Sequence, residues 1–546
     1  MILRIEYVAH AGVYDYPAAR RREFEEWLSL RNGSYYLETF GCQMNTLDSQ
    51  LVEGQLRARG LRATSQIREA DLVLFNTCSV RQHAEDKVLS RLGALGAVKR
   101  RRPEMIVGVI GCMAEREKDG LLTRAPVVDL LCGPAELNRL PALLDEVHER
   151  RERVAALTGT LSRRTEVLAR ALEYDSLEAL DLSREPAPDE SVLQSYIRVQ
   201  RGCDKFCTYC VVPFTRGPER SRPPGHIVEE ARRLAQRGCR EVTLLGQTVN
   251  SYVHQEDGRP VRFARLLERV HEVEGIDRIR FVTSFPADWD EDIFRVLRDC
   301  PRVMPYLHIP AQSGSDTVLR RMKRGYSVAD YLRLIDAARR HLPHISLAGD
   351  FIVGFCGETD RDFQQSIELL ERVEYKSVFV FKYSPRPGTA AERAQDDDVS
   401  DDAKRARNIE LLGVQERISL RHRQALVGRT VEILVEGPSK ISRRAPQTEQ
   451  ERDVEVAHGA ERVPSRTQLV GRTPGDLIVV FDGDAAQIGA LAQVRIERAS
   501  PLTLFGTLES IASPPRAPRP LDGKLESPSA AHGLPILSAG SQSPNQ

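Results

Sequence analysis

The feature that most constrains the fold is a repeated alternation between short apolar stretches and longer helix-like stretches. YYLETFGCQMN from Tyr35, DLVLFNTCSV from Asp71 and MIVGVIGCMAE from Met105 are each predicted to be a strand that ends in a cysteine-containing loop. Helix-like segments such as DSQLVEGQLRARG separate these strands. This order favours a parallel sheet whose strands are joined by helical crossovers.

The same alternation resumes at Ser195 and continues for about 230 residues, which predicts a complete or partial (βα) barrel. The candidate strands are EVTLLGQTVN, RIRFVTSFP, MPYLHIPAQ, ISLAGDFIVGF and KSVFVFKYSP. Catalytic groups of such barrels lie at the carboxyl ends of the strands. The polar side chains at the predicted ends are Gln247, Asn250, Ser284, Gln312, Ser313 and Asp350.

After about residue 424 short alternating strands predict a small β-barrel. The stretches GRTVEILVEGPSK, GDLIVVFDG and AQVRIERAS are separated by Gly/Pro turns. The chain is therefore predicted to be a multidomain α/β protein with six segments. These are a poorly ordered leader (1–33), an N-terminal α/β domain (34–150), a linker (151–190), the barrel (191–423), the small β-barrel (424–512) and a disordered tail (513–546).

Composition excludes some functional classes. Lysine plus arginine and aspartate plus glutamate each total 78, so the net charge argues neither for nor against a nucleic-acid partner. No apolar run approaches the roughly 20 residues that span a bilayer, and the first residues lack the order of a signal peptide. We therefore expect a cytoplasmic protein. Ten cysteines in such a chain favour metal binding or catalysis over disulfides.

Three cysteines, Cys42, Cys78 and Cys112, each follow a predicted strand of the N-terminal sheet. Because parallel strands end on one edge of a sheet, these cysteines can converge there. The alternative is three small buried apolar side chains, which is common for single cysteines. Three equivalent positions favour a shared metal site.

Three more cysteines, Cys203, Cys207 and Cys210, lie in RGCDKFCTYC with the spacing C-x3-C-x2-C. No fourth cysteine or histidine is adjacent, so a closed structural zinc site is not favoured. A catalytic zinc with an open position and an iron–sulfur cluster held by three thiolates both remain. The other cysteines, Cys132, Cys239, Cys300 and Cys356, lack such spacing and are predicted to be structural.

With Tyr209 directly before its last cysteine, this motif resembles the cluster motif of radical S-adenosylmethionine (SAM) enzymes. The resemblance narrows to the methylthiotransferases of that superfamily that act on tRNA and covers about residues 34–510. It rests on FGCQMNTLDSQ, NTCSVRQHAEDKVLSRLG, GCMAE, RGCDKFCTYCVVPFTRGPERSRP, LLGQTVNSY, LHIPAQSGSD and DFIVGFCGET in this order.

This resemblance implies a domain organisation and two cofactor sites. An N-terminal methylthiotransferase domain would hold an auxiliary [4Fe-4S] cluster on Cys42, Cys78 and Cys112. A partial barrel would hold a second [4Fe-4S] cluster on Cys203, Cys207 and Cys210 and bind S-adenosyl-L-methionine at the open iron. A TRAM domain, the small β-barrel, would grip RNA. No catalytic side chain beyond the cluster ligands is assigned.

The implied reaction adds a methylthio group to C2 of N6-isopentenyladenosine at position 37 of tRNA, beside the anticodon. The target is an unactivated aromatic C–H, which no acid or base side chain can deprotonate, so radical chemistry is needed. The implied partners are the tRNA anticodon loop, an electron donor and a sulfur or cluster supply system. We expect no membrane association and a monomer.

The residues after Cys42 set the expected substrate. Gln43, Met44 and Asn45 resemble the isopentenyladenosine branch, whereas the threonylcarbamoyladenosine branch usually has Lys-Val-Asn and the ribosomal-protein branch Pro-Lys-Asn. Methylthiolation of threonylcarbamoyladenosine or of a ribosomal protein remains the alternative. A non-catalytic RNA-binding zinc protein is the alternative outside this chemistry. The chain departs from the family pattern at Phe285, where His is common, and at Cys356, where Pro is common.

Several basic residues are candidate RNA contacts. An ordinary solvated surface is the alternative for those after the cysteine motif, whereas the two that flank the motif can face either substrate. Three follow the cysteine motif, two flank it and two lie near the small β-barrel: Arg216, Arg220 and Arg222; Arg198 and Arg201; Arg429 and Lys440.

Overall fold

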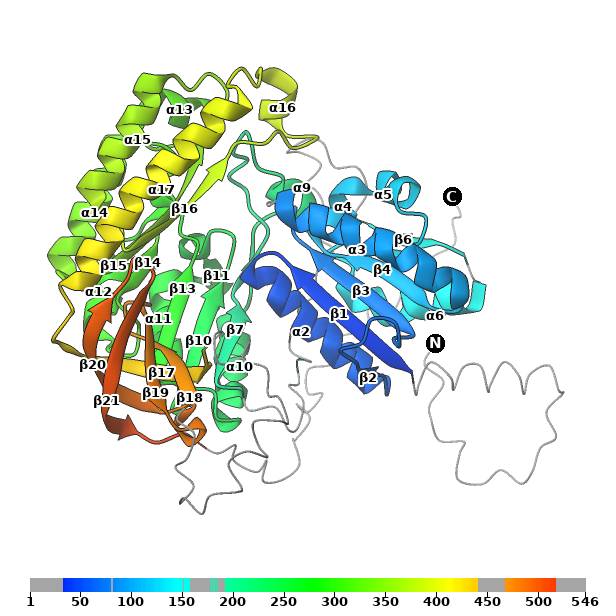
Figure 1. Cartoon of the computed structure of the whole chain (residues 1–546), viewed down its shortest axis with the longest axis horizontal. Helices are drawn as coiled ribbons and strands as arrows, with labels where there is room; N and C mark the ends of the chain where they lie inside the picture. The colour runs from blue at the N-terminus through cyan, green and yellow to red at the C-terminus, as the bar shows by residue number, and fades with distance from the viewer. Residues whose placement is uncertain are drawn as a thin grey trace, which may run out of the picture.

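The computed structural model describes residues 33–79, 82–150, 152–157, 192–439 and 467–516, and the single residues Glu178, Leu180, Asp181 and Arg184. Nearly all of the predicted leader and tail and most of the predicted linker fall outside these residues, as does Lys440 with the segment after it. Figure 1 shows an α/β body in blue and cyan, a larger α/β body in green and yellow, and a small β-barrel in orange to red. The predicted fold class is confirmed.

The N-terminal body is built on a six-stranded parallel sheet in the order β2-β1-β3-β4-β5-β6. The strands are β1 (Ser34–Phe40), β2 (Arg62–Ala63), β3 (Leu72–Thr77), β4 (Ile106–Ile110), β5 (Leu130–Cys132) and β6 (Val154–Ala156). Every residue of β3 and β4 is buried, which explains their continuous apolar sequences. The short strands β2, β5 and β6 were not predicted.

Helices cover both faces of this sheet. On one face pack α2 (Gln43–Ala58) and α6 (Leu140–Arg150). On the other face pack α3 (Gln82–Arg101), α4 (Cys112–Glu117) and α5 (Asp119–Arg124). Since both faces are covered, only the edge where the strands end remains for a ligand.

The second body is a partial barrel of parallel strands. One sheet has the order β13-β10-β7 and the next has the order β14-β15-β16. Its strands are β7 (Gln194–Arg198), β10 (Glu241–Leu245), β13 (Arg278–Val282), β14 (Tyr306–His308), β15 (Ser346–Val353) and β16 (Ser377–Lys382). The bridge between Ile279 and Val303 joins the two sheets. Within the described residues β7 and β16 do not pair, so the barrel is open on one side.

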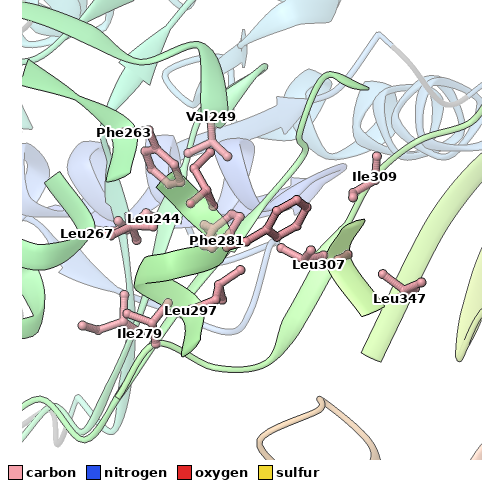
Figure 2. Close-up of a cluster of buried hydrophobic side chains, with 14 of the residues drawn as sticks. Leu244, Val249, Phe263, Leu267, Ile279, Phe281, Leu297, Leu307, Ile309 and Leu347 are labelled. Atoms are coloured by element: carbon pink, nitrogen blue, oxygen red, sulfur yellow. The ribbon is translucent and has the colours of Figure 1, made fainter. Parts of the chain in front are cut away.

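Amphipathic helices cover the outer face of the partial barrel. They are α10 (Pro224–Gln236), α11 (Phe263–His271), α12 (Asp292–Asp299), α14 (Val328–His341), α15 (Asp360–Val373) and α17 (Asp401–Gln424). Figure 2 shows side chains from strands and helices that meet in this core, among them Leu244, Phe281 and Leu307 from strands and Leu267 and Leu297 from helices. The apolar face of each strand therefore points outward to the helices, and the inward face of the barrel is available for a ligand.

The small β-barrel is closed in the order β17-β18-β19-β21-β20. Its strands are β17 (Thr430–Pro438), β18 (Thr467–Arg472), β19 (Ile478–Gly483), β20 (Leu491–Ala499) and β21 (Thr503–Ser513). The three predicted strands correspond to β17, β19 and β20. The structure adds β18 and β21.

The turn between β18 and β19 closes the amino-terminal end of the partial barrel. Arg280 donates from Nη1 to the Pro474 carbonyl (2.9 Å) and from Nη2 to the Thr473 carbonyl (2.8 Å). Lys376 pairs with Asp476 (2.6 Å). The opposite, carboxyl-terminal end thus remains the place for a site. Among the described residues, no helix has the length and apolarity needed to cross a bilayer.

Candidate metal centre

The three N-terminal cysteines lie at one edge of the sheet. Cys42 precedes α2 after β1, Cys78 follows β3, and Cys112 opens α4 after β4. Strand β1 is next to β3, and β3 is next to β4, so the three positions are neighbours. The Cys78 amide donates to the Phe40 carbonyl (2.9 Å), which ties two of the loops together.

Close packing of the loops around these cysteines requires glycine. Gly41 has φ +149°, and a Cβ there would lie 2.5 Å from the Cys78 Cβ. Gly111 has φ +89°, and a Cβ there would lie 2.4 Å from the Asn76 Oδ1. Both contacts are too short for a side chain, so the Gly-Cys pairs in the sequence reflect the close approach of three loops.

The chemical state of Cys42 differs from that of its neighbours. A hydrogen bond from the Cys78 thiol, together with the positive charge of Arg216, lowers the pKa of Cys42 to about 5. Burial raises the pKa of Cys112. Cys42 is partly exposed, whereas Cys78 and Cys112 are buried. The group therefore combines one partly exposed cysteine whose pKa is lowered with two buried cysteines, which suits ligation by a metal cluster.

The second cysteine set, Cys203, Cys207 and Cys210, lies in the loop of residues 202–211, which we call the cysteine loop. Gly202 has φ +68°, and a Cβ there would lie 2.0 Å from the Pro218 carbonyl oxygen. The Cys210 amide donates to the Cys207 carbonyl (3.1 Å). Burial, reinforced by the charge of Cys207, raises the pKa of Cys210 to about 12.

A buried arginine that the sequence analysis did not single out contacts the cysteine loop. Arg324 donates from Nη1 to the Cys207 Sγ (3.3 Å) and to the Tyr209 hydroxyl (3.5 Å). Its guanidinium also lies 4.7 Å from the centre of the Phe285 ring. Arg324 is thus positioned to stabilise a thiolate at Cys207. No spacing pattern links it to the cysteines, because 117 residues separate the two in sequence.

Iron–sulfur clusters are held by cysteine thiolates, and each cysteine set supplies three of them. Over the described ranges, no group of three or more Cys, His, Asp or Glu side chains is arranged to hold one metal ion. All ten cysteines lie in the described residues, and none is in a disulfide.

Unsatisfied polar atoms mark the carboxyl ends of the barrel strands. Gln247, Ser284 and Gln312 each bury a side-chain oxygen without a hydrogen-bond partner, and Gln200 buries both of its amide atoms in this way. Buried polar groups normally have partners, so these atoms fit a polar ligand such as SAM. Of the other predicted residues, Asn250 bonds the Phe285 backbone and therefore has a structural role.

Two further strand-end residues are paired within the protein. Ser313 accepts a hydrogen bond from the Ser315 amide (3.1 Å). Asp350 lies 3.2 Å from the His308 Nε2. Ser313 is therefore a loop-stabilising residue, whereas Asp350 remains on the inward face of the barrel.

The two cysteine sets face each other across a contact between the two bodies. Helix α4, which begins at Cys112, packs against α9 (Val212–Arg216), which directly follows the cysteine loop. The charge of Cys112 also adds to the raised pKa of Cys210. The neighbouring pocket is lined by Met44 and Pro134 on one side and by Gln247 on the other. Residues far apart in sequence thus form one composite site.

Arginines of the partial barrel form ion pairs across this contact between the two bodies. Arg216 Nη2 lies 2.9 Å from Asp48 Oδ2, and Arg198 Nη2 lies 2.6 Å from Asp48 Oδ1. Arg222 is buried too, with its Nη1 2.8 Å from Glu230. An ordinary solvated surface, the alternative for Arg216 and Arg222, is therefore wrong. All three arginines pair with carboxylates inside the protein, and Arg198 and Arg216 also line the pocket.

The other basic residues that are candidate RNA contacts lie in different surroundings. Arg201 pairs with the buried Asp181 and so also serves the interior. Arg429 is exposed directly before β17 and remains a candidate RNA contact. Arg220 lies in the two-residue strand β9 (Arg220–Ser221) and is partly buried. The two family departures are both buried, with Phe285 next to Arg324 and Cys356 in an apolar cluster with Phe355 and Tyr383.

Three family profiles match the chain. The radical SAM superfamily matches residues 197–370, the family described as "Uncharacterized protein family UPF0004" matches residues 34–133, and the TRAM domain matches residues 448–508. The matches to the first two cover all six cysteines of the two sets.

Curated relatives match over most of the chain. A tRNA-2-methylthio-N(6)-dimethylallyladenosine synthase of Rhodopirellula baltica is 47% identical over 87% of this chain and 95% of the relative. Proteins of the same name from Roseobacter denitrificans and Protochlamydia amoebophila are 40% and 39% identical, over 85% and 87% of this chain and 96% of each relative. Among solved structures, the radical SAM methyltransferase TsrM from Kitasatospora setae matches with a TM-score of 0.46 at 15% identity, over 66% of this chain and 75% of that one.

Proposed function

Because the chain belongs to the family of tRNA-2-methylthio-N(6)-dimethylallyladenosine synthases, we propose that its composite site adds a methylthio group to C2 of N6-isopentenyladenosine in tRNA. The modified base is at position 37, beside the anticodon. The protein is a radical SAM methylthiotransferase that uses S-adenosyl-L-methionine and two [4Fe-4S] clusters. Its TRAM domain and its relatives' names support tRNA as the substrate.

The observation that carries this proposal is the meeting of two cysteine sets, one at a sheet edge and one in a barrel loop. Cys42, Cys78 and Cys112 would hold the auxiliary cluster, and Cys203, Cys207 and Cys210 would hold the cluster that binds SAM. Three protein ligands per set leave one iron of each cluster for a small molecule. When bound, these clusters and SAM supply the one-electron chemistry needed to break an unactivated aromatic C–H bond.

The chain's own residues would bind the cofactor, orient the cluster ligands and shield the reacting centres. Gln200, Gln247, Ser284 and Gln312 present buried polar atoms at the strand ends, where a polar cofactor would satisfy them. Arg324 holds the Cys207 sulfur by a hydrogen bond. The contact between α4 and α9 brings the two sets together, so both reacting centres can reach one flipped-out base.

The proposed reaction needs further partners besides tRNA. An electron donor must reduce the clusters, and a sulfur or cluster supply system must replace the sulfur that each turnover consumes. We further propose that the enzyme acts as a monomer in the cytoplasm, where tRNA is found. Of the two basic residues near the small β-barrel, Arg429 lies within the described residues and is the candidate for a phosphate contact.

The direct test is the nucleoside content of tRNA. A strain lacking the gene should accumulate isopentenyladenosine, and the wild-type gene should restore the methylthio derivative, as measured by mass spectrometry of digested tRNA. Cys207→Ala should fail to restore it while the purified variant still binds tRNA. Cys239→Ala, a buried cysteine outside both sets, is the matched control. Unchanged methylthio-isopentenyladenosine in the deletion strain would contradict the proposed substrate.

A further inference from the structure

Strand β16 turns two phenylalanines toward the inside of the partial barrel. Val378 and Val380 pack into the core under the helices, so the alternating residues Phe379 and Phe381 lie on the opposite face. Their rings are stacked, with centroids 6.4 Å apart and planes inclined by 20°. The stacked pair, which we call the Phe379–Phe381 platform, therefore lies on the inward face of the last strand.

Within the described residues, the Phe379 side of the platform is apolar surface left uncovered, whereas Phe381 is partly buried. Phe379 is 54% exposed and is the only aromatic residue among the exposed large apolar side chains of the described part. A single exposed apolar side chain is ordinary on a protein surface. A stacked aromatic pair on the inner face of a barrel is different, because that face is where a ligand binds.

The strand register places the platform beside inward-facing residues of β15. Phe379 is paired with Asp350, and Phe381 is paired with Ile352, so these side chains share the inward face. Ile352 packs against the same apolar cluster as Tyr209 of the cysteine loop. The row with Phe381 is therefore the one nearer the cysteine loop, and the row with Phe379 is two residues farther from it along the strand.

The segment after β16 links the platform to both cysteine sets. Ala391 donates its amide hydrogen to the Thr208 carbonyl of the cysteine loop (2.8 Å). In the same segment Arg386 Nη1 lies 3.6 Å from Glu85 Oε1 of α3, the helix that follows Cys78 in the chain. The segment that continues from the platform strand thus contacts both bodies that carry the cysteine sets.

We propose that the Phe379–Phe381 platform binds the N6-prenyl group and the adjoining base edge of the target adenosine, and so sets the preference for prenylated tRNA. This inference rests on the proposed function. Aromatic rings hold flipped-out bases by stacking, and they provide apolar surface for a branched alkyl chain. Each methylene that leaves water on such a surface changes the affinity roughly fourfold. The platform can therefore discriminate a prenylated adenosine from an unmodified one.

The test compares two anticodon stem–loop RNAs that differ only in the isopentenyl group. The cluster-loaded enzyme with SAM is titrated anaerobically with each RNA, and fluorescence anisotropy gives the two dissociation constants. The ratio of the dissociation constant for the unmodified RNA to that for the prenylated RNA should fall at least about fourfold in Phe379→Ala and in Phe381→Ala, which is the contribution of one methylene group removed from water. Ile409→Ala is the control, because Ile409 is 65% exposed on α17, which covers the other face of β16.

The outcomes separate this inference from the proposed function. If wild-type enzyme does not methylthiolate the prenylated stem–loop, the proposed function fails. If wild type does so, and both phenylalanine variants keep the wild-type ratio, the platform inference fails alone. Equal weakening for both RNAs would mean that the rings stack on the base only and would also overturn the inference. Weaker SAM binding with an unchanged RNA ratio would assign the rings to the cofactor and overturn it as well. Unchanged iron content and thermal unfolding of each variant show that it is folded.

Discussion

Asp48 of α2 and Arg216 of α9 form a buried ion pair, with Oδ2 and Nη2 2.9 Å apart, that joins the N-terminal sheet to the partial barrel. The second oxygen of the same carboxylate lies 2.6 Å from Arg198 of β7. One carboxylate thus pairs with two arginines from the other body, and Asp181 lies 3.8 Å from Arg198 as a second partner. This places a fixed connection beside the point where the two cysteine sets meet.

Asp48→Asn should destabilise the contact between the two bodies strongly. The change leaves two buried guanidinium groups without their carboxylate, and removing one partner of a buried pair costs about 3–5 kcal/mol. Thermal unfolding of the anaerobic enzyme should show the loss as a lower midpoint. The control is Glu53→Gln on the same helix, because its pair with Arg57 is about one-third exposed. That variant should lose at most about 1 kcal/mol, and an equal loss in both variants would contradict the account.

Arg216 should raise the reduction potential of the auxiliary cluster. Burial alone would lower the pKa of Arg216, but Cys112, Asp48 and Cys42 raise it, so a positive charge is fixed beside these cysteines. A nearby cation favours the reduced, more negative state of a cluster. Arg216→Gln should therefore shift the midpoint to a more negative value, whereas Arg216→Lys should stay near wild type.

The potential is measured by an EPR-monitored titration in a variant whose three barrel cysteines are replaced by alanine, so that one cluster remains. Identical midpoints for Arg216→Gln and its parent would show that the arginine serves only the ion pair with Asp48.

Glu358 should make the stability of the enzyme depend on pH. Burial raises its pKa from the ordinary 4.5 to about 7, although the Gly354 amide and Arg407 favour its charged form. The folded state therefore keeps a proton that the unfolded chain releases. This contribution is fully present below about pH 4.5 and is lost as the pH rises through about 7.

The Glu358→Gln variant should show a flatter fall of the denaturation midpoint than wild type between about pH 5 and 7.5, because its side chain stays neutral. Urea denaturation at several pH values gives this slope. Glu371→Gln, at an exposed position of the neighbouring helix α15, should keep the wild-type slope. The opposite ranking of the two variants would contradict the prediction.

Local patterns predicted the sheet edge and the cysteine loop because their causes are local. A buried strand is continuously apolar, and the Gly-Cys pairs at Gly41 and Gly111 record the close approach of neighbouring loops. The positions of Cys42 and Cys112 at the same edge, two strands apart, followed from this and from the rule that parallel strands end at one edge.

The arginines show what the sequence could not predict. Arg216 and Arg222 follow the cysteine loop in a charged stretch, which is typical of an exposed surface. The carboxylate partner of Arg216 is Asp48, 168 residues away, and nothing local indicates such pairing. For Phe379 the strand was predicted but the exposure was not, because the run VFVF does not indicate which face would be covered.

Iron counting on cysteine variants tests the central claim most directly, namely that two separate sets of three cysteines each hold one cluster. Wild-type protein prepared anaerobically should contain about eight irons per chain, and Cys78→Ala and Cys207→Ala should each retain about four. Cys132→Ala, at the end of the neighbouring strand β5, should retain about eight. Loss of all iron in either single variant, or a wild-type content of about four or less, would contradict the account.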